Sequence, residues 1–319
     1  MATENLSSFC SILKESRKLI SSHSRHFLAL SVLFLLPLSF SLIAFPTLQS
    51  TITNPVTTKP QTLLRYNLHT LQRFPAFFSL LYTFILILFT LSASASITFS
   101  VYHAFYARPV KLVSALASLS NSFFRLFATF FCGQVMVFAA LIVLGLVCFG
   151  VVRGFEYLGY EIADFKVGYV IGVGLLGFVF FCLQVNWVLA PVIVVVESSW
   201  GLEPLRRSAY LVKEMRWVVV CMLLYFGGIG WLFVWGSWQS SVGEGVLRGV
   251  MFVVQTVLVS AALTMMMLHC VAANTVLYMY CKALHGELAG EIAEEFAREY
   301  VTLPFDDEKV PHLVSFVHP

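Results

Sequence analysis

The side chains of this chain that are best able to do chemistry are polar residues set inside long apolar runs. They are Gln134, Asn186, Gln255, His269 and Asn274. A polar group inside a bilayer is costly and often marks a transport pathway, but in this set only His269 has an ionisable side chain. Two interpretations stay open. We favour hydrogen bonds that help helices to pack; the alternative is a carrier or channel site for a small or lipid-like solute.

No pattern in the sequence is typical of an enzyme or of a cofactor site. The sequence contains no GxSxG, HExxH, P-loop or paired-carboxylate arrangement. Its seven cysteines form neither a CxxC pair nor a Cys/His cluster. Gly172-x-Gly174-x-x-Gly177 lies within an apolar run and follows no strand, so it does not predict dinucleotide binding. With Gly168 it gives Gly168-x-x-x-Gly172, a spacing that predicts close helix packing. We therefore expect no enzyme activity, no cofactor and no metal site.

Six long apolar runs dominate the chain. About 20 helical residues, rising about 1.5 Å each, cross the hydrocarbon core of a bilayer, and a water-soluble domain cannot bury six such segments. The sequence therefore predicts an all-α fold, a polytopic membrane bundle of six transmembrane helices with cytosolic amphipathic helices. The runs are Phe27–Leu48, Phe77–Val101, Phe123–Val152, Val167–Val196, Trp217–Gly236 and Val250–Tyr280.

The runs divide the chain into three parts. Residues 1–26 form an amphipathic N-terminal segment, residues 27–281 the six-span domain, and residues 282–319 an acidic tail. Acidic residues between Glu287 and Glu299 predict that the sixth span continues into the tail as a solvated helix. Cys10 and Cys281 lie next to the membrane on this view, and whether they carry a lipid stays open.

The basic residues predict the orientation. Loops on the cytosolic side of a membrane protein carry an excess of Lys and Arg. Fourteen of the 20 fall on the side that also holds both ends of the chain, and the net charge of only +3 does not indicate nucleic acid. Both termini are therefore expected in the cytosol. The fourteen are Lys14, Arg17, Lys18, Arg25, Arg108, Lys111, Arg125, Arg206, Arg207, Lys213, Arg216, Lys282, Arg298 and Lys309.

Three segments on that side have apolar residues at helical spacing, with basic residues off the apolar face. The first, from Leu6 to Ile20, is expected to lie on the anionic cytosolic leaflet. The second opens at Arg108-Pro109, and the third at Glu203-Pro204, where proline suits the first helical turn. The bilayer is thus the main expected partner. Protein partners at the cytosolic face and the oligomeric state stay open.

The join between the fourth span and the third amphipathic helix carries the sharpest motif. Pro191 is expected to bend or end the span, and Gly201 to permit a turn into the helix that begins at Pro204. Glu197, at the interface, is expected to pair with Arg206 or Arg207 and so fix the angle of the turn. This elbow motif comprises Trp187, Pro191, Glu197, Gly201, Pro204, Arg206, Arg207 and Ser208.

The elbow motif, together with Lys213-x-x-Arg216-Trp217, resembles the pattern of a plant family of six-span integral membrane proteins without assigned function. The resemblance covers essentially the whole chain. More distantly, the chain is similar to the membrane domain fused to some bacterial glycerophosphodiester phosphodiesterases. The sequence shows no soluble phosphodiesterase domain, so this likeness implies no hydrolase activity. We expect a non-enzymatic scaffold or bilayer-organising component of an endomembrane, such as the ER, or of the plasma membrane.

Overall fold

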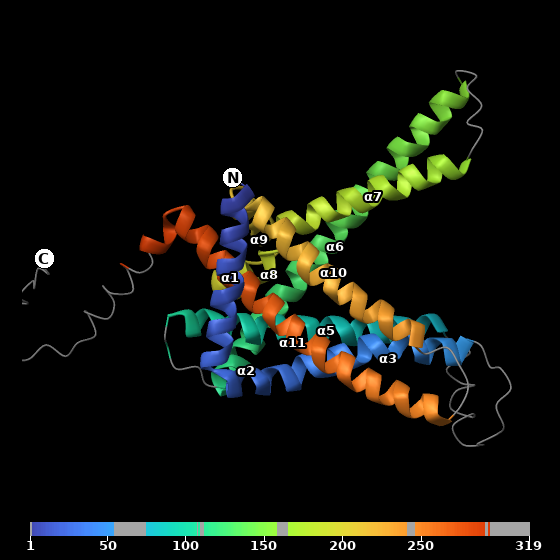
Figure 1. Ribbon diagram of the computed structural model, residues 1–319. Helices are drawn as coiled ribbons and strands as arrows, with labels where there is room; N and C mark the ends of the chain where they lie inside the picture. The colour runs from blue at the N-terminus through green and yellow to red at the C-terminus, as the bar shows by residue number, and fades with distance from the viewer. Residues whose placement is uncertain are drawn as a thin grey trace, which may run out of the picture.

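The structure, a computed structural model, describes residues 2–53, 75–106, 108, 112–157, 165–240, 246–290 and 293. Within these ranges every regular element is helical, which confirms the predicted all-α fold (Figure 1). The elements are α1 (Ala2–Ser22), α2 (Ser24–Leu30), the π-helical turn η1 (Ser31–Leu35), α3 (Leu36–Thr53), α5 (Pro75–Phe105), α6 (Leu112–Tyr157), α7 (Phe165–Trp187), α8 (Ala190–Val196), α9 (Glu203–Val212), α10 (Arg216–Ser240) and α11 (Val246–Leu284).

Six helical segments in the described part are long and apolar enough to cross a membrane, so this is an integral membrane protein. Two of these spans combine several elements: α2, η1 and α3 form the first, and α7 and α8 form the fourth. The segments match the six apolar runs of the sequence. They are Ser24–Phe45, Ser79–Phe105, Leu112–Val151, Gly172–Val196, Arg216–Ser237 and Val253–Leu284.

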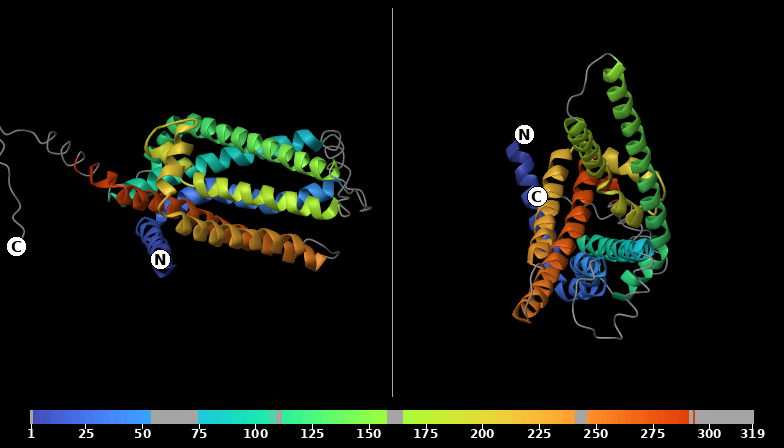
Figure 2. Two further views of the ribbon diagram at one scale, coloured as in Figure 1. Left: turned by 90° about the horizontal axis from the view of Figure 1, so that it is seen from above. Right: turned by 90° about the vertical axis from the view of Figure 1, so that its right-hand side faces the viewer.

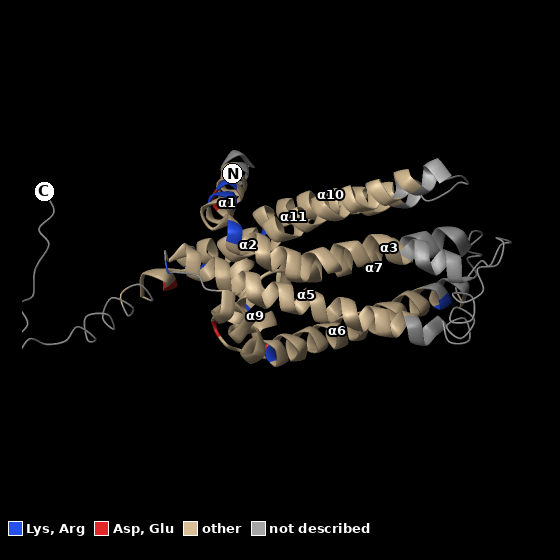
Figure 3. Ribbon diagram, turned by 90° about the horizontal axis from the view of Figure 1, so that it is seen from below, with Lys and Arg blue, Asp and Glu red and all other residues tan. Residues whose placement is uncertain are grey.

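The spans run in one general direction but splay apart, α6 and α7 diverging from α10 and α11, and the short helices gather at the end where the spans come together (Figures 1 and 2). At that end α1 runs across the span helices rather than along them, and α9 lies nearby. Most of the coloured Lys and Arg of Figure 3 lie there too. We call this end, formed by α1, the α8–α9 connection, α9 and the last turns of α11, the short-helix end.

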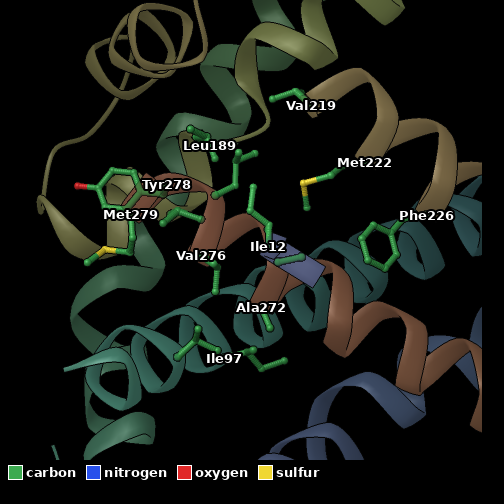
Figure 4. Packing of buried hydrophobic residues seen from close by; sticks show 14 of the residues in the cluster. Ile12, Ile97, Leu189, Val219, Met222, Phe226, Ala272, Val276, Tyr278 and Met279 are labelled. Atoms are coloured by element: carbon green, nitrogen blue, oxygen red, sulfur yellow. The ribbon is translucent and has the colours of Figure 1, made fainter. Parts of the chain in front are cut away.

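The main hydrophobic core lies toward the short-helix end, where α1, α5, α10 and α11 meet the turn before α8. Ile12, Leu189, Val219 and Tyr278 are almost fully buried there (Figure 4). The middle of α6 differs, because most of its large apolar side chains between residues 131 and 151 are exposed. In a membrane protein lipid can cover such side chains, so their exposure here is consistent with a helix at the edge of the bundle.

The second amphipathic helix does not exist as a separate element. We expected it to open at Arg108-Pro109 and to precede the third span, but α6 runs without a break from Leu112 to Tyr157. The sequence between Leu112 and Phe131 contains no Gly or Pro to stop a helix. The amphipathic segment is therefore the first part of the third membrane helix.

The tail also departs from expectation. Instead of continuing through Glu287 as one helix, α11 ends at Leu284, and Gly286 adopts a left-handed φ of 74°. Such a glycine commonly ends a helix. Residues 287–290 are helical again, and nearly all of the tail after Gly290 lies outside the described residues.

The surroundings of several glycines and cysteines bear on what the sequence predicted or left open. Gly172 was expected at a close helix contact, yet a Cβ built on it, or on Gly174 or Gly177, meets no atom within 4 Å. Cys281 was a candidate for lipidation, but its side chain is completely buried. Cys10 is exposed.

The position of the core predicts that a larger side chain destabilises the protein at the short-helix end but not on the middle of α6. Ala272 is fully buried on α11, so Ala272→Leu should overpack the cluster and lower the stability by about 1–3 kcal/mol. The matched change Ala139→Leu is at an exposed position on α6 and should have little effect. Thermal unfolding of both variants in the same detergent checks this, and equal melting temperatures would contradict the placement of the core.

Candidate functional site

The fourth span is broken at the elbow motif. α7 ends at Trp187, residues 188 and 189 form a turn, and α8 starts again with Pro191 in its first turn. A proline there lacks only an N–H that would have no helical partner anyway. The expected bend at Pro191 is therefore present as a full interruption, which leaves backbone groups near residues 186–189 in need of other partners.

Ser208 of α9 satisfies two of these backbone groups. Its hydroxyl donates to the carbonyl oxygen of Asn186 at 2.7 Å and accepts the N–H of Leu189 at 3.2 Å. Ser208 and Leu189 are both fully buried, so the Leu189 N–H cannot turn to water instead. One small hydroxyl thus fastens α9 across the break in the span.

The turn between α8 and α9 is held by α6. Gly201 has a φ of 77°, and Ser198, a residue type that seldom does so, has a φ of 56°. The Arg125 side chain donates to the carbonyl oxygen of Ser198 at 3.1 Å, and the Gly201 N–H donates to the Thr129 hydroxyl at 3.1 Å. Since Arg125 and Thr129 are four residues apart on α6, one helix face fixes both left-handed residues.

A network of charged and hydroxyl groups joins the elbow to the end of α11. Arg207 pairs with Glu197, Nε to Oε2 at 3.3 Å, and its Nη2 also contacts a carboxylate oxygen of Glu287. The Tyr278 hydroxyl donates to Glu197 Oε1 at 2.8 Å, and Lys282 Nζ donates to the Tyr278 hydroxyl at 3.3 Å. We call Glu197, Arg207, Tyr278, Lys282 and Glu287 the elbow network.

The elbow network contains two carboxylates and two cations, so its formal charges balance. Burial lowers the pKa of Arg207, but the hydrogen bond to Glu287 and the charges of Glu197 and Glu287 outweigh it, and the net effect raises this pKa. Arg207 therefore stays charged at any physiological pH. Lys282 is only 4% exposed, and its ammonium also lies 5.6 Å from the centre of the Tyr278 ring.

The sequence predicted part of this arrangement. The expected partner of Glu197 was Arg206 or Arg207, and Arg207 makes the contact while Arg206 is exposed. Pro204 is buried in the first turn of α9, and Trp187 is the last residue of α7. The roles of Tyr278, Lys282 and Glu287 were missed. The four-residue spacing of Tyr278 and Lys282 could have predicted the contact between those two, but no local signal links either of them to Glu197 or Glu287 to Arg207.

The structure does not gather the five intramembrane polar residues into one site. The Asn186 side chain donates to the Cys182 carbonyl and His269 Nδ1 to the Met265 carbonyl, each at 2.9 Å, and Asn274 lies 3.9 Å from Cys270 Sγ. Each of these three contacts stays within one helix, to the residue four positions earlier, so they are not the hydrogen bonds between helices that we favoured. Gln134 is exposed on α6, and Gln255 is half-buried on α11.

The described part of the chain contains no cluster of side chains that could serve as a metal site. No group of three or more His, Cys, Asp or Glu residues lies close enough there to hold a metal ion. The carboxylates of the elbow network are each engaged by a cation or a hydroxyl. What the network can do is structural: it links the fourth span, α9, the sixth span and the start of the tail.

Two neighbouring arginines allow a direct test of the network. Arg207→Gln should lower the stability by about 1–3 kcal/mol, because it leaves two partly buried carboxylates without their cation. Arg206→Gln removes the same charge from an exposed position one residue away and should change the stability by less than about 0.5 kcal/mol. Thermal unfolding in detergent measures both. Similar losses in the two variants would show that the network does not hold the elbow.

The break in the span gives a second test. Ser208→Ala leaves the Asn186 carbonyl and the Leu189 N–H without their partner and should cost about 1–3 kcal/mol of stability. Ser120→Ala is the control, because the Ser120 hydroxyl is exposed and bonds only to the Ala117 carbonyl of its own helix. An unchanged melting temperature for Ser208→Ala would mean that α9 is not fastened through this hydroxyl.

Comparison with known proteins places the chain in a family. A family model described as "Domain of unknown function (DUF8558)" matches residues 4–310. A comparison with curated proteins and a comparison with solved structures each gave no match. Since the matched region includes all six spans and the elbow, this protein belongs to the DUF8558 family.

Proposed function

We propose that the protein is a non-enzymatic scaffold of an endomembrane, such as the ER, or of the plasma membrane, with both termini in the cytosol. One observation carries the proposal: α9 is fixed rigidly at the short-helix end, by Ser208 and by Arg207, while its opposite face stays exposed. A rigid helix with a free face at the membrane surface suits the binding of another protein.

The orientation rests on the position of the basic residues. Lys14, Arg17, Arg206 and Lys213 belong to α1 and to the segment around α9, which lie at the same end of the bundle (Figure 3). Cytosolic loops carry the excess of Lys and Arg. The short-helix end therefore faces the cytosol in this proposal, and the connections at the opposite end face the lumen or the outside.

The exposed face of α9 has the composition of a protein contact. Leu202, Arg206, Tyr210 and Lys213 follow one another at helical spacing, and all four are exposed, Leu202 at 57% and Tyr210 at 55%. Tyr and Arg are enriched at protein interfaces, where they supply area and directed hydrogen bonds. The opposite side of α9, including Leu205 and Leu211, is buried in the bundle.

The intramembrane polar residues support a scaffold over a carrier. A carrier needs polar groups that converge on its solute near the middle of the membrane. Asn186, His269 and Asn274 instead each make a contact within their own helix, and no hydrogen bond in the described part of the chain joins any two of them. The resemblance to plant six-span proteins is consistent with this proposal and adds no activity to it.

A proximity-labelling peroxidase fused to the C-terminus tests orientation and scaffolding together. Cytosolic proteins should be labelled, because the tail is proposed to lie in the cytosol. At least one of them should be labelled several-fold less with the Leu202→Ala/Tyr210→Ala variant, since truncating a hot-spot side chain such as an interface Tyr costs about 2 kcal/mol or more.

The matched control is Val143→Ala/Leu146→Ala, which truncates two exposed side chains on the lipid-facing part of α6. Its labelling profile should equal that of the wild type. Labelling of lumenal or extracellular proteins would overturn the orientation. A profile that the α9 variant leaves unchanged, together with solute release from liposomes that contain the purified protein, would replace the scaffold with a carrier.

A further inference from the structure

The N-terminal helix α1 does not use its apolar face to enter lipid, because the bundle already occupies that face. Ile12 and Ser16 are fully buried and Ile20 nearly so. These residues lie four apart and form one stripe along the helix. The stripe packs against α10 and α11 as part of the main core.

Polar and aromatic contacts fix the same side of α1. The Tyr280 hydroxyl of α11 donates to the Glu15 carboxylate at 2.8 Å, and Ser11 lies 3.4 Å from the same hydroxyl. The rings of Phe9 and Tyr225 meet edge to face with 5.9 Å between their centres. α1 is therefore a docked helix whose rotation about its own axis is set by the protein.

This rotation turns a row of basic side chains outward. Lys14, Arg17 and Lys18 are all exposed, on the side of α1 opposite the buried stripe, and Arg25 is exposed shortly after the helix ends. Glu15 carries the only carboxylate among residues 7–22, and it is turned to Tyr280. The outward face of Lys14, Arg17 and Lys18, which we call the basic face of α1, thus carries positive charge alone.

The position of α1 along the length of the bundle indicates what surrounds its basic face. Its contact residue Tyr280 lies one turn before the end of α11, and that end closes the sixth span at Leu284. α1 also runs across the spans, on the flank of α10 and α11 (Figures 1 and 2). A helix on the flank of a membrane bundle, at the last turn of a span, lies among the lipid headgroups.

We propose that the basic face of α1 binds the phosphate groups of anionic phospholipids. Lys and Arg near a membrane surface are attracted to anionic lipid, and both side chains donate hydrogen bonds to phosphate oxygens. Lipid is favoured over an acidic protein segment because the bilayer already surrounds the spans at this level. The inference takes its leaflet, the cytosolic one, from the proposed function and adds the class of lipid that the protein gathers there.

The test uses the full-length protein in phosphatidylcholine vesicles that contain a trace of spin-labelled lipid. Labelled phosphatidylserine should associate with the wild type more strongly than labelled phosphatidylcholine. The variant Lys14→Gln/Arg17→Gln/Lys18→Gln should lose about fivefold or more of this preference, because each basic residue near the surface contributes about 1 kcal/mol before screening by salt. All three side chains are exposed, so the fold should persist, and an unchanged melting temperature verifies it.

The control removes the same charge elsewhere at the same end. Arg206→Gln/Lys213→Gln/Arg216→Gln changes three exposed basic residues on and beside α9 and should keep most of the preference for phosphatidylserine. An equal loss in both variants would show diffuse attraction and overturn a site on α1, and so would a preference that the α1 variant retains.

A second measurement needs no variant. Raising the salt to about 1 M shortens the Debye length to about 3 Å and should abolish the lipid preference of the wild type; a preference that persists would overturn the electrostatic origin. Both experiments use the purified protein without other proteins. In the vesicles both leaflets have the same lipid composition, so the result does not depend on which way the protein is inserted. Failure of the lipid site is therefore distinguishable from failure of the scaffold or of its orientation.

Discussion

The contact of Arg207 with two carboxylates is the interaction on which the short-helix end depends. Glu197 follows the fourth span, Arg207 belongs to α9 and Glu287 follows α11. One guanidinium therefore joins three segments, and Arg207 and Glu287 are 80 residues apart in the sequence. Arginine suits this role because its planar group presents several donors at fixed angles. None of the three side chains is fully exposed, so solvent screens the pairs less than on an open surface.

The last turns of α11 connect the Arg207 contact to α1 at the other side of the short-helix end. Tyr278 bonds to Glu197 of the elbow, and two residues later Tyr280 bonds to Glu15 of α1. Residues two apart on a helix point in widely different directions, so α11 holds α9 on one side and α1 on another. The buried side chains between them fill the space (Figure 4). The surface helices are thereby fixed to a membrane helix rather than floating on the bilayer.

The sequence predicted what depends on neighbouring residues and missed what depends on distant ones. Apolar length marked the spans, and Pro191, Gly201 and Pro204 marked the elbow, since each acts through its own backbone. Whether Arg206 or Arg207 meets Glu197 depends on how α9 is rotated against the bundle, which Ser208 and the core decide. The Glu287 contact needs the turn at Gly286, and the amphipathic pattern after Arg108 does not show whether a helix stops or continues into the span.

The two docked helices expose faces of different chemistry, and this difference separates their proposed roles. The exposed face of α9 mixes Leu202 and Tyr210 with Arg206 and Lys213, whereas the basic face of α1 offers charge with no large apolar side chain between its members. Apolar and aromatic area gives a protein partner something to bury. Charge alone gives little area, but it suffices for mobile headgroups, which a bilayer supplies in excess. Under the two proposals together, the protein holds a protein partner and an anionic lipid at the same membrane surface.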